Sequence, residues 1–280
     1  MHRVTFKDLP LRPDPLTGLS PIVHHVCFGL FLLQWALVWL WLWLPAPPFG
    51  NADWPEALLV LLVTATTLVS LGRQLPGQNV LLAAAIIGFV SGAVQSLGAL
   101  TGIPFGPYHY TESCGQQFFH VLPWPVPFIW IVAILNARGV ARSALRPWRQ
   151  ARNYGFWLIG VSVLLVVLFA LGLEPFATTF KHYWTWEATR LRCDWYGAPC
   201  VNFLGWALTA LLLLVFVTPA LLKKRPVRYP PNYYLLAVWL LINLLFITGA
   251  VVRQLWPAVI VSSAGSLVVG VFALVSRKPK

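Results

Sequence analysis

The sequence predicts an all-α membrane protein, a single-domain bundle (residues 1–280) of about eight transmembrane helices with both termini in the cytoplasm. The first observation behind this prediction is composition. Of the 280 residues, 58% are hydrophobic and 10% are charged, whereas a soluble domain carries about 25% charged residues. Such a chain cannot cover a surface that faces water, so lipid must be the solvent for much of it. Long uncharged runs and a one-sided distribution of Lys and Arg are the other two observations.

Eight apolar stretches are long enough to cross the hydrocarbon core as helices, which takes about 20 residues. They are 22–44, 56–72, 79–99, 121–140, 153–173, 201–222, 233–252 and 254–276. Helices are expected because a backbone in lipid must satisfy its own hydrogen bonds. The first stretch ends on Trp39, Trp41 and Trp43, as an aromatic belt does at a membrane interface. Pro257 falls in the first turn of the last stretch, where proline is tolerated.

The basic residues predict how the bundle is oriented. If the N-terminus lies in the cytoplasm, 16 of the 20 Lys and Arg residues fall in inner segments, and only Lys181, Arg190, Arg192 and Arg253 fall outside. An excess of Lys and Arg marks the cytoplasmic side, so this split predicts an even number of spans. The formal charge of +12 is then that of a membrane face, and nucleic acid is not an expected partner. We expect a multi-pass protein of a bacterial or archaeal cell membrane.

Polar side chains gather on the predicted outer side, mainly in two long segments, about 100–123 and 174–200. Both segments are rich in Trp, Tyr and Phe, so we expect them to be ordered and to fold back into the outer half of the bundle. Long connections in compact domains are usually functional or disordered. The acidic residues and histidines on this side are Asp53, Glu56, Glu112, Glu174, Glu187, Asp194, His109, His120 and His182.

Glu174 is the leading candidate for chemistry among these groups. It directly follows 21 uncharged residues and precedes Pro175. An ionisable group at the membrane boundary is costly unless it is paired or functional. One interpretation is a carboxylate that reaches out to the interface. The other is a carboxylic acid that stays protonated where water is excluded and donates its proton.

Aromatic clusters occupy both long segments. In residues 101–111 (TGIPFGPYHYT), Gly and Pro favour a tight turn just before Tyr108 and Tyr110. The second segment carries Trp184 and Trp186 and later runs into the sixth span. These clusters are also compatible with an interfacial loop that contributes belt aromatics.

At the start of the sixth span, Asn202 and Trp206 are four residues apart and therefore share a helix face. Asn202 could act in chemistry or simply pack helices together.

Metal and cofactor sites are not expected. His109, His120, His182, Cys114 and Cys193 show no short ligand pair such as HxxxH or CxxC, the spacing that metal sites use. The sequence also lacks the GxGxxG and Walker A patterns that bind nucleotide cofactors. A disulfide among Cys114, Cys193 and Cys200 is compatible with an oxidising outer side.

Together these motifs resemble the integral-membrane carotenoid biosynthesis proteins, a family that includes carotenoid 1,2-hydratases and bisanhydrobacterioruberin hydratase. The resemblance covers about residues 90–215. The matching pieces are 102–111 (GIPFGPYHYT), Val126-Pro127 before Trp130, Glu174-Pro175, Trp184-Thr185-Trp186 and 196–206 (YGAPCVNFLGW). The chain departs from the family pattern at 169–173 (FALGL), where a further Asp is often found, and at 113–116 (SCGQ), where a Leu-Gly pair is expected.

The resemblance implies a hydro-lyase that adds water to a terminal double bond of an acyclic or monocyclic carotenoid through a tertiary carbocation. That reaction needs a proton donor, rings that stabilise the cation and one admitted water. We assign the proton to Glu174, with Glu112 as the alternative, and the orientation of water to Asn202 or His109. The expected substrate contacts are Phe105, Tyr108, Tyr110, Trp184, Trp186, Tyr196 and Trp206, among them Tyr and Trp rings whose π faces can stabilise a cation.

The expected partners are the isoprenoid substrate, membrane lipid and other enzymes of the carotenoid pathway. Two other functions are compatible with the sequence. A carotenoid end-group cyclase would use the same protonation and quench the cation internally, whereas a non-catalytic protein would only bind or carry an isoprenoid. A transporter is disfavoured because no span carries a charged residue at its centre.

Overall fold

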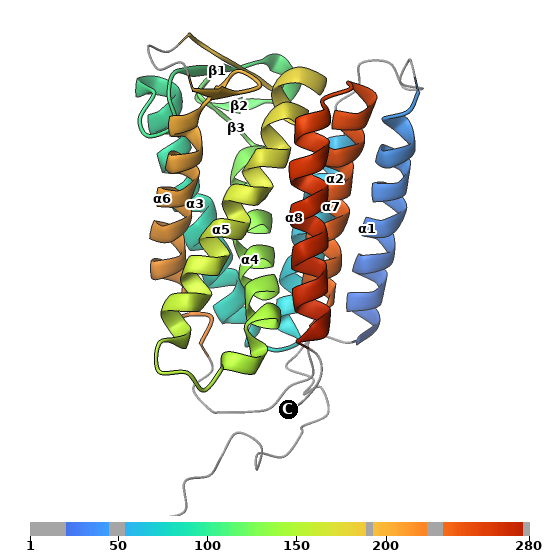
Figure 1. Cartoon of the computed structure of the whole chain (residues 1–280), viewed down its shortest axis with the longest axis vertical. Coiled ribbons are helices and arrows are strands. Elements are labelled where there is room, and N and C mark those ends of the chain that lie inside the picture. The colour runs from blue at the N-terminus through green and yellow to red at the C-terminus, as the bar shows by residue number, and fades with distance from the viewer. Residues whose placement is uncertain (1–20, 45–53, 189–192, 223–231, 277–280) are drawn as a thin grey trace, which may run out of the picture.

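The computed structural model describes residues 21–44, 54–188, 193–222 and 232–276. It confirms the predicted fold, since eight helices in these ranges are long and apolar enough to cross a membrane. They run up and down in one bundle (Figure 1). Their bounds are α1 Pro21–Trp41, α2 Trp54–Gly72, α3 Gly77–Thr101, α4 Pro125–Ala144, α5 Tyr154–Pro175, α6 Cys200–Val217, α7 Tyr234–Val252 and α8 Trp256–Val275.

Short elements gather at one end of the bundle, which we call the strand end (Figure 1). Three antiparallel pairs of strands form there: β1 (Tyr108–Tyr110) with β4 (Trp184–Trp186), β2 (Gln117–Phe118) with β3 (Leu122–Pro123), and β5 (Asp194–Trp195) with β6 (Ala198–Pro199). The 3-10 turn η2 (Glu112–Cys114) and the π turn η4 (Phe176–Phe180) belong to the same segments. As predicted, the two long connections fold back onto the helices, because β1 and β3 pack on α3 and β5 packs on α5.

Helix α1 begins and α8 ends at the end opposite the strands (Figure 1), as an even number of spans requires. The arginines of the α2–α3 and α4–α5 connections lie at this opposite end, the latter around the 3-10 turn η3 (Arg146–Trp148). The location of this end in the cytoplasm remains a prediction from the Lys and Arg distribution.

Helix boundaries differ from the predicted ones where local structure intervenes. Helix α4 begins at Pro125 rather than 121, because Leu122 and Pro123 belong to strand β3. Helix α6 ends at Val217, and turns replace the predicted last residues of the span. The short break after Val252 does separate two helices, α7 and α8.

Helix α4 forms the centre of the bundle and packs against α2, α3, α5, α7 and α8. Helices α1 and α8 are the least enclosed, and large apolar side chains such as Phe89, Leu164 and Ile260 are exposed on the outer helix faces. An exposed apolar surface of this extent is what a bundle presents to lipid.

Candidate active site

Glu174 lies at the strand end of α5, where Pro175 changes the helix. A proline has no N–H and frees the carbonyl four residues before it, which here belongs to Leu171. The indole N–H of Trp195 donates to that carbonyl (3.0 Å). The chain then continues as the π turn η4, a conformation often found at functional sites. The regular helix therefore ends at Pro175, directly after Glu174, and the carbonyl that the proline frees links strand β5 to the helix.

The β5–β6 hairpin positions the start of α6 next to Glu174. Strands β5 and β6 are joined by Tyr196 (φ 52°) and Gly197 (φ 87°), and a two-residue loop with two positive φ angles is the favoured hairpin connection. A disulfide between Cys193 and Cys200 closes the base of the hairpin. Of the cysteines considered for a disulfide, Cys114 is not part of this bond and is buried. The hairpin leads directly into α6, which carries Asn202.

The β1–β4 ribbon presents four aromatic rings on one face. Tyr108 pairs with Trp186 and Tyr110 pairs with Trp184 in the antiparallel register. Because side chains alternate along a strand, these four rings share one side. They are in contact, with ring centroids 5.1 Å apart for Tyr108 and Trp186 and 6.2 Å apart for Tyr110 and Trp184.

Two glycines allow the loop that leads into this ribbon to pack closely against α3 and α6. Phe105 is 1% exposed, and its ring fills the space between Gly98 of α3 and Gly205 of α6. A Cβ atom would lie 2.7 Å from the ring at Gly98 and 2.6 Å from it at Gly205. Any side chain larger than hydrogen would displace Phe105, so both glycines are required for this close approach.

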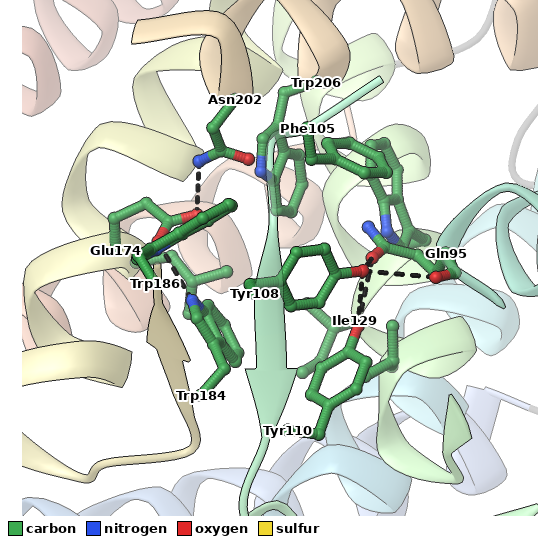
Figure 2. A pocket seen from close by; sticks show the side chains of 13 residues that line it. Gln95, Phe105, Tyr108, Tyr110, Ile129, Glu174, Trp184, Trp186, Asn202 and Trp206 are labelled. Atoms are coloured by element: carbon green, nitrogen blue, oxygen red, sulfur yellow. Dashed lines mark hydrogen bonds between the residues drawn. The ribbon is translucent and has the colours of Figure 1, made fainter. Parts of the chain in front are cut away.

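The carboxyl group of Glu174 is held by three N–H donors within the bundle (Figure 2). The indoles of Trp184 and Trp186 each donate to Oε2 at 3.1 Å, and the amide of Asn202 donates to Oε1 at 2.6 Å. Glu174 and Asn202 are each only 1% exposed. No ion pair with Glu174 occurs among the described residues. A buried carboxyl whose partners are neutral side chains is rare and is typical of a functional group.

A second polar group, around Gln95 of α3, lies on the other side of Tyr108 from Glu174 (Figure 2). The hydroxyls of Tyr108 and Tyr110 donate to Gln95 Oε1 at 2.8 and 3.0 Å. Burial raises the pKa of Tyr108 to about 12 and raises the pKa of Tyr110 well above its usual range. Both phenols therefore stay protonated at neutral pH and act as hydrogen-bond donors.

A cavity of about 30 Å³ lies between these groups, enough for about one or two water molecules. Glu174 is the only carboxyl among the described residues that line it, and none of these residues is basic. The indoles of Trp130 and Trp206 stack at 4.2 Å along one wall. The full lining is Gln95, Phe105, Tyr108, Tyr110, Val126, Ile129, Trp130, Leu173, Glu174, Trp184, Trp186, Asn202 and Trp206.

Comparison with known proteins assigns the chain to a family. A family model described as "Carotenoid biosynthesis protein" matches residues 56–271, which include all of the cavity lining. The chain belongs to this family.

This carotenoid biosynthesis protein also resembles a named relative. It is 27% identical over 209 residues to a bisanhydrobacterioruberin hydratase of Haloarcula japonica, and the match covers 74% of this chain and 57% of the relative. The chain thus matches less than two thirds of that relative's length. No solved structure matches the chain.

Most of the residues predicted from the sequence meet at the cavity of this carotenoid biosynthesis protein. The structure brings together Phe105, Tyr108, Tyr110, Glu174, Trp184, Trp186, Asn202 and Trp206.

Three predicted residues lie outside the cavity. His109 is on the opposite face of β1 from the two tyrosines, exposed, with Nε2 2.5 Å from Glu187 Oε1. Glu112 is exposed in the turn η2. The hydroxyl of Tyr196 accepts the backbone N–H of Ala258 at the start of α8 (3.3 Å). The roles in catalysis and substrate binding expected for these three residues stay predictions, and their positions outside the cavity give them no support.

Sequence reasoning missed Gln95, Trp130 and the apolar side chains that complete the lining. Gln95 did carry a signal, since a polar residue inside an apolar span often marks a site. Trp130 was part of the family motif but was given no role. In the described ranges, no three or more His, Cys, Asp or Glu side chains gather in one place, and the expectation that no metal is needed remains a prediction.

Proposed function

We propose that this protein is a carotenoid hydratase, which protonates a terminal isoprenoid double bond and adds water to the resulting cation. One observation carries the proposal: a fully buried carboxyl group, Glu174, faces a cavity walled by aromatic rings and receives hydrogen bonds from neutral donors only. Family membership supports a carotenoid substrate, and the name of the Haloarcula japonica relative supports hydration as the reaction.

The first step is proton transfer from Glu174. The O–H bond of its carboxylic acid breaks, and the proton forms a C–H bond at the less substituted carbon of the terminal alkene. The positive charge then resides on the tertiary carbon. The three N–H groups of Trp184, Trp186 and Asn202 are already directed at the two oxygens where negative charge develops. Preorganised donors of this kind stabilise a transition state without further rearrangement.

Asn202 suits both protonation states of Glu174. A side-chain amide offers NH2 donors and a carbonyl acceptor. Its NH2 group can donate to the carboxylate, and after rotation its carbonyl can accept the O–H of the carboxylic acid. Asn202 is buried on α6, and its amide already contacts Glu174 Oε1 at 2.6 Å.

Aromatic rings stabilise the carbocation. The rings of Trp184, Trp186, Trp206 and Tyr108 line the cavity, and each ring whose face meets the cation contributes about 0.5–2 kcal/mol to binding it. The absence of Lys, Arg and His from the described lining means that no positive side chain opposes the developing charge.

The polar group around Gln95 orients the water. Its amide and the hydroxyls of Tyr108 and Tyr110 supply donors and acceptors on the far side of the cavity from Glu174 (Figure 2). The water oxygen bonds to the tertiary carbon, and the proton it then loses restores the protonated Glu174. The balance is one alkene and one water consumed for one tertiary alcohol formed.

Substrate admission requires movement of the lining. The cavity holds about one or two water molecules, so a terminal dimethyl-alkene group enters only when neighbouring side chains shift. The rest of the polyene would lie between apolar helix faces or in lipid, which suits a hydrocarbon that water cannot dissolve.

The test is expression of the full chain in a host that makes lycopene, followed by mass analysis of the pigments. We expect products heavier than lycopene by one water for each modified end. Glu174→Gln should lower conversion by about 10²–10⁴-fold, the usual contribution of a general acid, because an amide cannot supply a carboxylic proton. Glu112→Gln is the matched control, since it removes an exposed carboxyl from the same end of the protein and should leave conversion unchanged.

The competing functions give different results. A cyclase would yield a product with the mass of lycopene and a changed absorption spectrum. A carrier would co-purify with pigment and leave it unaltered, with Glu174→Gln binding as well as the wild type. Full hydration by Glu174→Gln would exclude Glu174 as the proton donor.

A further inference from the structure

A second cavity lies at the end of the bundle opposite the strands, far along α4 from the candidate active site. Its volume is about 40 Å³. Its polar lining comes from the residues just after α2, from α4 and the segment after it, and from the residues just before α7. The polar residues are Gln74, Arg138, Arg142, Ser143, Arg146, Arg149 and Asn232.

Arg138 is the unusual member of this group. It lies on α4 six residues before the last residue, Ala144, and thus about 9 Å inside the end of the helix at a rise of about 1.5 Å per residue. It is 5% exposed. A charged side chain at such a depth is costly, and in membrane proteins it usually marks a functional pathway or site.

The hydrogen bond that Arg138 makes does not balance its charge. Its guanidinium donates to the backbone carbonyl of Leu221 at 3.4 Å, although a guanidinium has five N–H donors. Arg142 follows one turn later and lines the same cavity, so two like charges lie at a spacing that is mutually unfavourable on a helix. An anion in the cavity would relieve both the burial and the repulsion.

The acidic residues of the described part of the chain cannot supply that anion. All of them lie at the strand end of the protein: Glu56, Glu112, Glu174, Glu187 and Asp194. The positive-inside rule accounts for basic residues in connecting segments. It does not account for a guanidinium enclosed between helices in a polar cavity.

We propose that this arginine cavity binds a phosphate group. Arginine rather than lysine forms it, and the planar guanidinium matches phosphate oxygens through paired N–H donors. Asn232 is held in place, since its Nδ2 donates to the Ser70 carbonyl at 2.8 Å and its Oδ1 accepts the N–H of Tyr234 at 3.2 Å. The phosphate can belong to an anionic phospholipid or to a free phosphate compound.

The surroundings favour the lipid source. Trp148, in the turn η3 after α4, and Trp157, near the start of α5, are exposed. Exposed tryptophans at a helix end usually lie at the depth of lipid headgroups. Basic pockets between helices at the cytoplasmic face are known places for anionic headgroups.

The test measures thermal unfolding of the full chain in detergent micelles with added phosphatidylglycerol, phosphatidylcholine, inorganic phosphate or diphosphate. We expect phosphatidylglycerol to raise Tm and phosphatidylcholine to have no effect. A rise with inorganic phosphate or diphosphate would assign the same site to a free phosphate compound. Arg142→Gln should lower the affinity for whichever ligand raises Tm by about tenfold or more, the effect of losing a hydrogen bond between charged groups.

Arg152→Gln is the matched control, because it removes the same charge from an exposed position outside the cavity at the same end. Arg138→Gln should behave like Arg142→Gln; if it fails to fold, the half-buried Arg142 still decides the question. The proposal is overturned if no phosphate-bearing ligand raises Tm, if Arg142→Gln keeps the full rise, or if Arg152→Gln loses as much as Arg142→Gln. None of these readouts depends on carotenoid conversion.

Discussion

The close packing of Phe105 between Gly98 and Gly205 allows a quantitative prediction about the shape of the active site. In Gly205→Ala, the new Cβ atom would lie 2.6 Å from Phe105 Cδ1 and 3.0 Å from the Pro104 carbonyl oxygen. Ordinary contacts of this kind begin at 3.4 Å, so the ring or α6 must shift by about 0.8 Å. The ring cannot retreat, because Gly98 of α3 approaches its other edge equally closely.

The magnitude follows from two opposing effects. Alanine in a helix is favoured over glycine by about 0.5–1 kcal/mol. Overpacking a filled site costs about 1–3 kcal/mol. Gly160→Ala isolates the first effect, since a Cβ atom added to Gly160 on α5 would meet nothing within 4 Å. Gly205→Ala should therefore be less stable than Gly160→Ala by about 1–3 kcal/mol.

The assay is unfolding of each variant in mixed micelles, followed by circular dichroism and compared as free energies of unfolding. Carotenoid conversion should fall in Gly205→Ala as well, because a displaced Phe105 moves Tyr108, which it contacts at a ring separation of 6.4 Å. Equal stability and equal conversion for the two alanine variants would refute the reasoning and show that the ring has room to move.

Trp195→Phe keeps an aromatic ring but removes the N–H bonded to the Leu171 carbonyl; losing this partly buried hydrogen bond should cost about 0.5–1.5 kcal/mol, measurable by thermal unfolding. Cys193 and Cys200 should react with an alkylating reagent only after reduction, as mass analysis of the denatured protein would show, and Cys200→Ser should lose about 2–3 kcal/mol of stability. Burial raises the pKa of Tyr108 from 10.0 to about 12, so the folded state holds this proton more tightly than the unfolded state does. Its contribution to stability is complete below pH 10 and is lost as the pH rises towards 12; Tyr108→Phe should flatten that decline in pH-dependent unfolding.

Each of these predictions has an outcome that would contradict it. Trp157→Phe, at an exposed position, should leave stability unchanged; an equal loss there would remove any special role for Trp195. Alkylation of both cysteines without a reductant would disprove the disulfide. An alkaline decline that Tyr108→Phe leaves unaltered would belong to other groups.

The sequence alone predicted the membrane bundle because burial in lipid acts on each helix separately. A span has to be long, mostly apolar and nearly free of charge whatever its neighbours are, so eight helices could be counted without knowing how they pack. Glu174 was found in the same way. A carboxyl at the end of an uncharged span, followed by a proline, is unusual in one dimension and needs no partner to be noticed.

Only the tertiary structure shows which polar residues line the cavity together with Glu174. His109 stands between two tyrosines in the sequence, but the pairing of β1 with β4 turns it away from the cavity and turns Tyr108 and Tyr110 inward. A strand of three residues in an aromatic loop is too short to show its alternation in the sequence. Gln95 lies at the site because α3 packs against β1, which brings it within hydrogen-bond distance of Tyr108.

The same limit applies at the opposite end of the protein. Local sequence placed Arg138 among the basic residues of an inner segment, whereas the packing of α2, α4 and α7 decided that it is enclosed beside a cavity. Span length and hydropathy are properties of one segment at a time, and the chain therefore displays them directly. Enclosure, hydrogen-bond partners and strand faces arise between segments far apart in the chain, and only the folded bundle determines them.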